Sequence, residues 1–181
     1  MLRSPAACGL QWMAAAASSS ATAQAALPAT PAPAARVSDV SSPDAIVAAV
    51  YDVISGPGAR KRDWNRLRSL FVPGARVVHT GKDGVNTARV MGVEDYIQAA
   101  GPFLEGEGFF EREVHRVVDR YGDIAQAFSI YESRHATSDA KPFQRGINSF
   151  QLMCDGRRLW VVTIYRRGER PDRPIPKRFG G

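Results

Sequence analysis

Apolar residues in the N-terminal half of the chain recur at the three- and four-residue spacing of amphipathic helices. Ser42 followed by Pro43 supplies the capping hydroxyl and first-turn proline of a helix start, and this helix ends before Gly56. Asp63 caps a second helix that ends at Pro73-Gly74, and a third is predicted over residues 93–104. The apolar stripe of the second helix comprises Trp64, Leu67, Leu70 and Phe71.

Beyond residue 108 the period changes to two, which predicts strands. Segments 76–80 and 85–91 form a hairpin around a loop at 81–84. Four longer strands follow over residues 109–120, 124–135, 145–154 and 157–166. The order of helices followed by strands predicts an α+β domain with an antiparallel sheet.

Asp155-Gly156 is typical of a two-residue type I′ turn and therefore predicts the pairing of the last two strands. Counting outward, Asn148 faces Thr163 and Tyr165 lies on the same side of the sheet. Both faces of this hairpin are partly apolar, so we expect helices to cover one face and a partner subunit or the C-terminal tail to cover the other.

Alternation over residues 109–120 places Glu111, Glu113 and His115 on one face of a strand, and Arg112, Arg116 and Arg120 on the other. Carboxylates and a histidine at this spacing resemble a metal-binding set. A charged outer face, cross-paired with arginines, is the favoured interpretation.

The formal net charge of +6 is carried by the ends of the chain. Residues 37–165 contain sixteen basic and sixteen acidic residues and are formally neutral. A nucleic-acid-binding domain needs excess positive charge on its folded surface, so this distribution argues against a nucleic-acid partner. The basic run over residues 60–68 is interpreted as a solvated helix face rather than a phosphate site.

Residues 1–25 have a positive start, a weak apolar stretch and a small-residue cleavage pattern, which predict a signal peptide and a periplasmic or secreted protein. A transit peptide or a misplaced start codon is the alternative. Residues 26–42 are predicted to be an Ala/Pro-rich linker, and residues 167–181 a basic, Pro-rich tail that lies over the sheet as a strap or reaches a neighbour. No apolar run is long enough to predict a membrane span.

The predicted order of elements resembles the nuclear transport factor 2-like superfamily, and its SnoaL-like bacterial branch in particular, over residues 43–166 and about four residues beyond. The local signatures are Gly101-Pro102-Phe103-Leu104, Tyr131-Glu132-Ser133-Arg134 and Asp155-Gly156. The resemblance implies a curved sheet wrapped around helices as a cone, often open onto a pocket, and a homodimer. Members include isomerases, dehydratases, polyketide cyclases and transport factors, so the fold does not fix the function.

Catalytic members of the superfamily use an Asp or His base and a Tyr or acid that binds the developing oxyanion. By this resemblance, His79 and Glu132 are candidate bases. The candidate ligand-binding residues are Arg134, Asn148, Thr163 and Tyr165. Each candidate also has a structural interpretation: a solvated histidine, a Glu132–Arg134 ion pair that closes the cone, or a tyrosine that packs its ring.

Three hypotheses for function follow. The leading one is an exported domain whose cone binds a small, mostly apolar molecule. The second is a cofactor-independent isomerase, dehydratase or cyclase. The third is an interaction module whose cone is filled by its own side chains. Phosphate loops and Cys/His metal spacings are absent from the sequence, so no cofactor is predicted.

Overall fold

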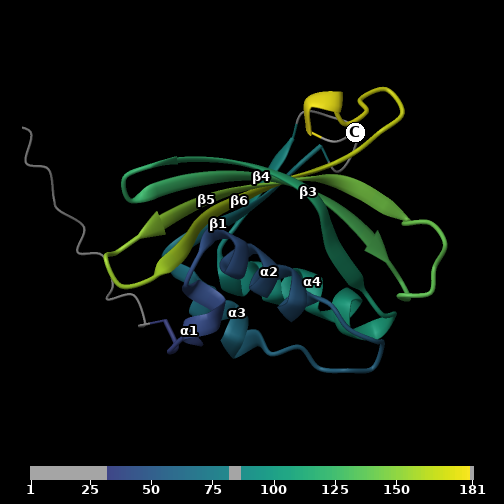
Figure 1. Ribbon diagram of the computed structural model, residues 1–181. Coiled ribbons are helices and arrows are strands. Elements are labelled where there is room, and N and C mark those ends of the chain that lie inside the picture. Colours follow the sequence, from purple (N-terminus) through teal and green to yellow (C-terminus); the bar gives the residue numbers. More distant parts are fainter. Residues whose placement is uncertain (1–31, 82–86, 180–181) are drawn as a thin grey trace, which may run out of the picture.

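A six-stranded sheet arches over a layer of helices in the computed structural model, which describes residues 32–81 and 87–179 (Figure 1). The predicted signal peptide, residues 26–31 of the predicted linker and most of the first hairpin loop lie outside the described residues. The strand order is β2-β1-β6-β5-β4-β3, with only β1 and β6 parallel. The strands are β1 (Phe71–Thr80), β2 (Ala88–Met91), β3 (Phe110–Tyr121), β4 (Ile124–Arg134), β5 (Gln144–Cys154) and β6 (Leu159–Gly168). The predicted α+β cone architecture is confirmed.

Three predicted helices are present, with the predicted caps for the first two. They are α2 (Pro43–Ile54), α3 (Trp64–Leu70) and α4 (Val93–Gly106). The Ser42 hydroxyl accepts a hydrogen bond from the Ala45 amide at 3.0 Å, and Asp63 accepts one from the Arg66 amide at 2.9 Å. The helix α3 ends earlier than predicted, because Phe71 already belongs to β1. No helix in the described part of the chain is long and apolar enough to cross a membrane.

The described part of the structure begins inside the predicted linker. A short helix, α1 (Val37–Val40), packs its buried Val40 against the core. Its Asp39 is held by Arg66 of α3, with the carboxylate 2.7 Å from Nε. The extended tether predicted over residues 26–42 is therefore wrong at its C-terminal end.

The basic run over residues 60–68 is not simply a solvated face. The Arg62 side chain is buried and donates hydrogen bonds to backbone carbonyls, including that of Ile54 at 3.1 Å and that of Gly56 at 2.7 Å. These carbonyls lie at and just beyond the end of α2, where no further helical turn can satisfy them. Arg62 thus joins α2 to the following loop.

The sheet has an inner face, which packs on the helices, and an outer face on the opposite side (Figure 1). On β4 the inner face carries Tyr131 and a row of small residues. The Tyr51 hydroxyl of α2 reaches one of them, Ser129, at 2.7 Å. These small inner residues are Ala125, Ala127, Ser129 and Ser133. The outer face of β4 carries Phe128 and Ile130.

The last two strands, β5 and β6, pair in antiparallel fashion as predicted, but the predicted register is wrong. Cys154 pairs with Leu159, so the turn contains four residues, with the Asp155 side chain accepting bonds from the Arg157 and Arg158 amides at 2.9 Å. A β-bulge at Val162 then changes which side chains face inward. Leu152 pairs with Val161, but Asn148 pairs with Arg166 instead of Thr163.

A second bulge, at Val114, breaks the predicted alternation of β3. Glu111 and Glu113 face inward, whereas His115 pairs with Ile130 of the outer face. The three side chains therefore do not form the metal-binding set considered above. They do not form a charged outer face either, because Glu111 is buried.

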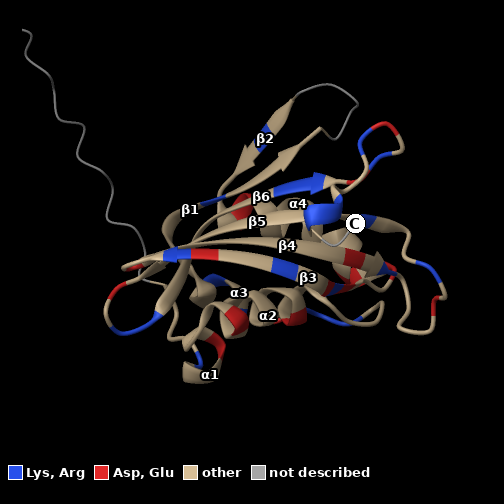
Figure 2. Cartoon of the chain, turned by 45° about the horizontal axis from the view of Figure 1, so that its top comes forward, with Lys and Arg blue, Asp and Glu red and all other residues tan. Residues whose placement is uncertain are grey.

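The C-terminal tail lies over the outer face of the sheet. Ile175 is buried, and Phe179 of the 3-10 helix η1 (Lys177–Phe179) stacks on Phe128 of β4, with ring centroids 5.2 Å apart. Glu169 accepts a hydrogen bond from the Ile175 amide at 2.9 Å. Figure 2 shows Lys and Arg gathered at the end of β6 and on this tail. The tail is thus the predicted strap over the sheet.

Candidate functional site

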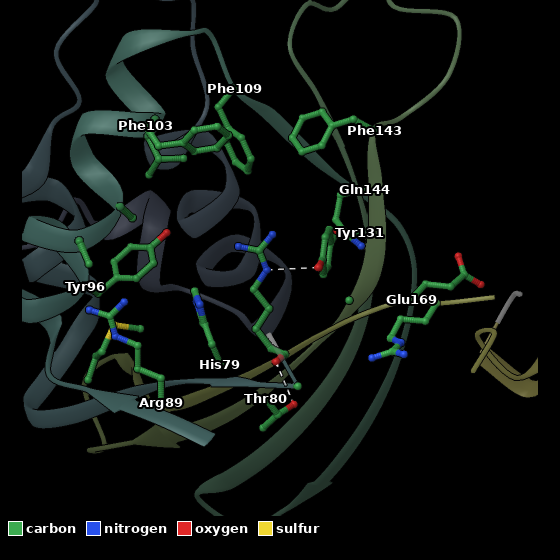
Figure 3. Close-up of a pocket in the computed structure, with 18 residues that line it drawn as sticks. His79, Thr80, Arg89, Tyr96, Phe103, Phe109, Tyr131, Phe143, Gln144 and Glu169 are labelled. Atoms are coloured by element: carbon green, nitrogen blue, oxygen red, sulfur yellow. Dashed lines mark hydrogen bonds between the residues drawn. The ribbon is translucent and has the colours of Figure 1, made fainter. Parts of the chain in front are cut away.

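A cavity of about 480 Å³ opens between α4 and the inner face of the sheet (Figure 3). Helix α4 supplies Tyr96, Ala99, Ala100 and Phe103, whose spacing places them on one helix face. The sheet contributes side chains from β1, β2, β4 and β6. A pocket of this size is within the range that binds small organic molecules.

Aromatic side chains form one wall of the cavity. Phe109 lies between Phe103 and Phe143, with ring centroids 5.9 and 6.2 Å away. Phe109 is buried, while Phe103 and Phe143 are 44% and 46% exposed and form part of the rim. Figure 3 shows these three rings together at the side of the cavity away from His79 and Arg89.

His79 and Tyr96 form the opposite, polar wall. The rings meet edge to face, with centroids 6.2 Å apart. His79 reaches the cavity because it lies on the inner face of β1, where it is the register partner of Arg166 on β6 and of Arg89 on β2. The sheet thus brings one imidazole and two guanidinium groups to the same end of the cavity.

Arg166 is the central polar residue of this end. Its Nε donates a hydrogen bond to the Tyr131 hydroxyl at 3.2 Å, and its guanidinium lies 5.0 Å from the centroid of the Tyr131 ring. Its Nη2 lies 3.5 Å from a carboxylate oxygen of Glu111. The bulge at Val162 is the reason that Arg166 faces inward.

Glu111 is held behind Arg166 by neutral donors. Its side chain is 2% exposed and accepts hydrogen bonds from the Ser133 hydroxyl at 2.8 Å and from Asn148 Nδ2 at 3.1 Å. Asn148 Nδ2 also donates to the Tyr51 hydroxyl at 3.2 Å. Such a buried carboxylate is stable only where cations and donors compensate for lost hydration, as they do here.

A small inner chamber of about 40 Å³ lies between this cluster and the cavity. His79, Tyr96 and Arg166 line both spaces, while Glu111 and Asn148 line only the chamber. Within residues 32–81 and 87–179, the buried Oδ1 of Asn148 has no hydrogen-bond partner. The chamber therefore presents an acceptor to whatever occupies it.

Burial and neighbouring charges keep the cavity tyrosines neutral and Arg166 charged. Burial raises the pKa of the Tyr96 hydroxyl to about 12, although Arg166 acts in the opposite direction. Burial also raises the pKa of Tyr131. For Arg166, burial opposes the charge, but Glu111 and the two tyrosines outweigh it and raise the pKa. At neutral pH the site offers guanidinium cations, Arg166 among them, and neutral hydroxyl donors.

The predicted site residues are divided between the two faces of the sheet. His79 lines the cavity, and Asn148 lines the inner chamber. Glu132 points to the outer face, where it forms ion pairs with Arg112 at 3.1 Å and Arg134 at 2.9 Å. The structure therefore does not bring Glu132 or Arg134 into the cavity.

Thr163 and Tyr165 also lie on the outer face, because the Val162 bulge reverses their orientation relative to the prediction. Tyr165 is 49% exposed. The polar residues that the sequence analysis missed are Tyr96, Arg166 and, as an inward group, Glu111. The helical spacing of Tyr96 and Phe103 could have indicated that both lie on one face of α4. No sequence pattern indicates the bulge that turns Arg166 inward.

Among the described residues, no group of three or more His, Cys, Asp or Glu side chains is placed to hold a metal ion. The lining of the cavity offers an imidazole, three guanidinium groups, neutral phenols and an apolar wall. These groups can bind an amphipathic molecule and can move a proton.

Sequence comparison finds no protein-family model that matches the chain, and no curated protein matches it. Solved structures do match. An uncharacterised protein with a cystatin-like fold from Caulobacter vibrioides has a TM-score of 0.54 and 13% identity, over 71% of this chain and 88% of its own. A protein of unknown function with a cystatin-like fold from Nostoc punctiforme has a TM-score of 0.54 and 12% identity, over 70% and 87% of the two chains.

A third match carries a family name. It is a protein of the nuclear transport factor 2-like family from Streptomyces avermitilis, proposed to be a dehydratase, with a TM-score of 0.53 and 14% identity over 71% of this chain and 94% of its own. Identity at this level shows a shared fold and leaves the SnoaL-like branch a prediction. The chain has the fold of the nuclear transport factor 2-like superfamily.

Proposed function

We propose that the cone binds a small, mostly apolar molecule. The observation that carries this proposal is the segregated cavity, with three phenylalanines at one side and His79, Tyr96 and Arg166 at the other. Burial of apolar surface would supply affinity, and the few polar groups would orient the ligand. The polar end differs from the predicted set of Glu132, Arg134, Asn148, Thr163 and Tyr165, of which only Asn148 lies nearby.

A thermal-shift screen with hydrophobic and steroid-like compounds tests the binding proposal, because a ligand that binds only the folded state raises Tm. Ala100→Phe, on the cavity face of α4, should fill the space and abolish the shift. Gln98→Phe introduces the same ring on the same helix, at an exposed position outside the cavity, and should keep it. Equal shifts in both variants would contradict binding in this cavity.

A second candidate is the cofactor-independent isomerase, dehydratase or cyclase. The adjacency of His79 and Tyr96 favours it, since an imidazole can accept a proton while a neutral phenol donates a hydrogen bond to a developing oxyanion. The matched protein from Streptomyces avermitilis is proposed to be a dehydratase. Glu132 no longer supports this candidate, because it is paired with arginines on the outer face.

Turnover of a candidate substrate would test the enzymatic role. His79→Ala should abolish it and Tyr96→Phe should lower it by about 100-fold, the size expected for one lost oxyanion donor. Glu132→Gln is the control and should retain full turnover. Loss of activity in Glu132→Gln alone would overturn the assignment of His79 as the base.

The cavity of about 480 Å³ supports the binding proposal over the third hypothesis, an interaction module whose cone is filled by its own side chains. We also propose a homodimer that uses the outer face of the sheet, where Val117, Tyr121 and Ile124 are exposed.

Export remains a proposal that rests on residues 1–25. Native mass spectrometry of protein from its exported compartment would report cleavage after Ala25, dimerisation and any retained ligand.

A further inference from the structure

The cavity has more basic than acidic groups in its lining. Arg89, Arg166 and Arg170 line it, with Glu169 as the only lining acid among the described residues. Glu169 is already paired with Arg145 at 3.1 Å and Arg170 with Asp172 at 2.9 Å, so the excess rests on Arg89 and Arg166. The local excess of positive charge favours an anion in the cavity.

Arg166 keeps donor capacity that the protein does not use. Its Nε is bonded to Tyr131, but within the described part of the chain neither terminal nitrogen makes a hydrogen bond, and the side chain is 27% exposed. The ion pair with Glu111, at 3.5 Å, is longer than a charge-assisted hydrogen bond. The oxygens of Glu111 are instead engaged by Ser133 and Asn148.

Tyr96 provides a second donor beside Arg166. Its hydroxyl makes no hydrogen bond within residues 32–81 and 87–179, and its side chain lines both the cavity and the inner chamber. Figure 3 shows the Tyr96 hydroxyl pointing into the cavity, toward the side where Tyr131 lies. Two donors that face an apolar wall across the cavity match the two oxygens of a carboxylate on an apolar body.

We infer that the ligand is a carboxylic acid with an aromatic or alkyl body. Its carboxylate accepts hydrogen bonds from Arg166 and Tyr96, and its body packs on Phe103, Phe109 and Phe143. This inference rests on the proposed binding function and adds the chemical class of the ligand. It also assigns the specificity for charge to Arg166, a residue that binds the ligand directly.

Two acid–amide pairs separate charge recognition from apolar binding: cinnamic acid with cinnamamide, and decanoic acid with decanamide. Within each pair the body is the same and only the charge differs. Titration calorimetry should show that the acid of at least one pair binds about tenfold or more tightly than its amide, as one charge-assisted hydrogen bond would give. The full chain is used throughout.

Variants test which residue distinguishes the acid from the amide. Arg166→Gln alone would leave the buried Glu111 unpaired and is prone to unfold, so the test variant is the double substitution Glu111→Gln/Arg166→Gln. In this double variant the affinities of the acid and its amide should differ by no more than about threefold, as expected when no charge-assisted hydrogen bond distinguishes them. Tyr96→Phe should reduce the acid's affinity by about fivefold, since one neutral hydrogen bond is lost. Arg120→Gln removes one charge at the far end of β3 and should preserve the full ratio.

The outcomes are distinguishable. If the amides bind as tightly as the acids in the wild-type protein, the carboxylate is not recognised and the inference fails, while the binding proposal stands. If the ratio persists in the double variant, Arg166 is not the recognising group and the inference is wrong. If neither acid nor amide of either pair binds, the binding proposal fails together with the inference.

Discussion

Two glutamates at the same end of the sheet show how differently one residue type is used on its two faces. Glu111 of β3 points inward, is 2% exposed and meets one arginine together with two neutral donors. Glu132 of β4 points outward, is 16% exposed and meets Arg112, Arg134 and Arg145. Glu111 and Arg166 form an ion pair beside the cavity in which the carboxylate is buried, whereas Glu132 belongs to an ion-pair network close to solvent.

The difference follows from hydration. A buried carboxylate that loses its partner retains an unpaired charge in a medium that solvates it poorly. An exposed carboxylate that loses a partner gains water in exchange. We therefore expect the inner arrangement to make a large contribution to the stability of the fold. The outer network should make a modest contribution that decreases with salt.

The largest effect is expected from matched alanine substitutions of the two glutamates. Glu111→Ala leaves Arg166 without its carboxylate and two neutral donors without an acceptor, so it should lower the free energy of unfolding by about 3–5 kcal/mol. Glu132→Ala should cost about 1 kcal/mol or less. Urea unfolding followed by circular dichroism measures both. Equal losses would mean that the inner and outer glutamates do not differ as their burial indicates.

An intermediate effect is expected where the tail covers the outer face. Ile175 is buried although it belongs to a segment that is otherwise largely exposed. Ile175→Ala should lower the free energy of unfolding by about 2 kcal/mol, the lower end of the range for a buried isoleucine. The exposed Pro174 offers the control, because Pro174→Ala removes little buried surface. Urea unfolding of both variants tests whether the tail stabilises the fold. An Ile175→Ala variant with the same free energy of unfolding as the wild-type protein would show that it does not.

The sequence predicted the elements better than it predicted which faces they present. Caps at Ser42 and Asp63 are local, so they were recognisable from a few residues. The row of β4 that ends in Glu132 and Arg134 was assigned to the pocket, but it lies on the outer face, where Phe179 of the tail stacks on Phe128. An apolar strand row marks burial, but it does not say which layer buries it.

Site residues were also assigned to the wrong face of the sheet, because the sequence does not indicate the β-bulges. A single extra residue in a strand reverses every side chain that follows. The bulge at Val162 moved Tyr165 outward and Arg166 inward, and the bulge at Val114 separated His115 from Glu111. His79 was placed in the cavity by sequence reasoning, because no bulge lies between it and the buried Val77 that precedes it on the same face.

The smallest effect concerns the pH dependence of the outer network. Burial opposes ionisation of Glu132, but Arg134 and Arg112 outweigh it and hold the pKa of its carboxyl below the usual 4.5. A carboxylate with a lowered pKa stabilises the fold above its unfolded pKa, and this contribution is lost as the pH falls through the folded pKa.

Glu132→Gln should therefore be less stable than the wild-type protein at pH 7, and the difference should shrink as the pH falls below about 4.5. High salt should reduce the difference at pH 7, because the network is close to solvent. Urea unfolding at a series of pH values, in low and high salt, measures this. Glu107, which is exposed at the end of α4 and has no ion pair among the described residues, gives the matched control Glu107→Gln. A Glu132→Gln difference that persists at low pH would mean that packing of the side chain, and not its charge, stabilises the outer face.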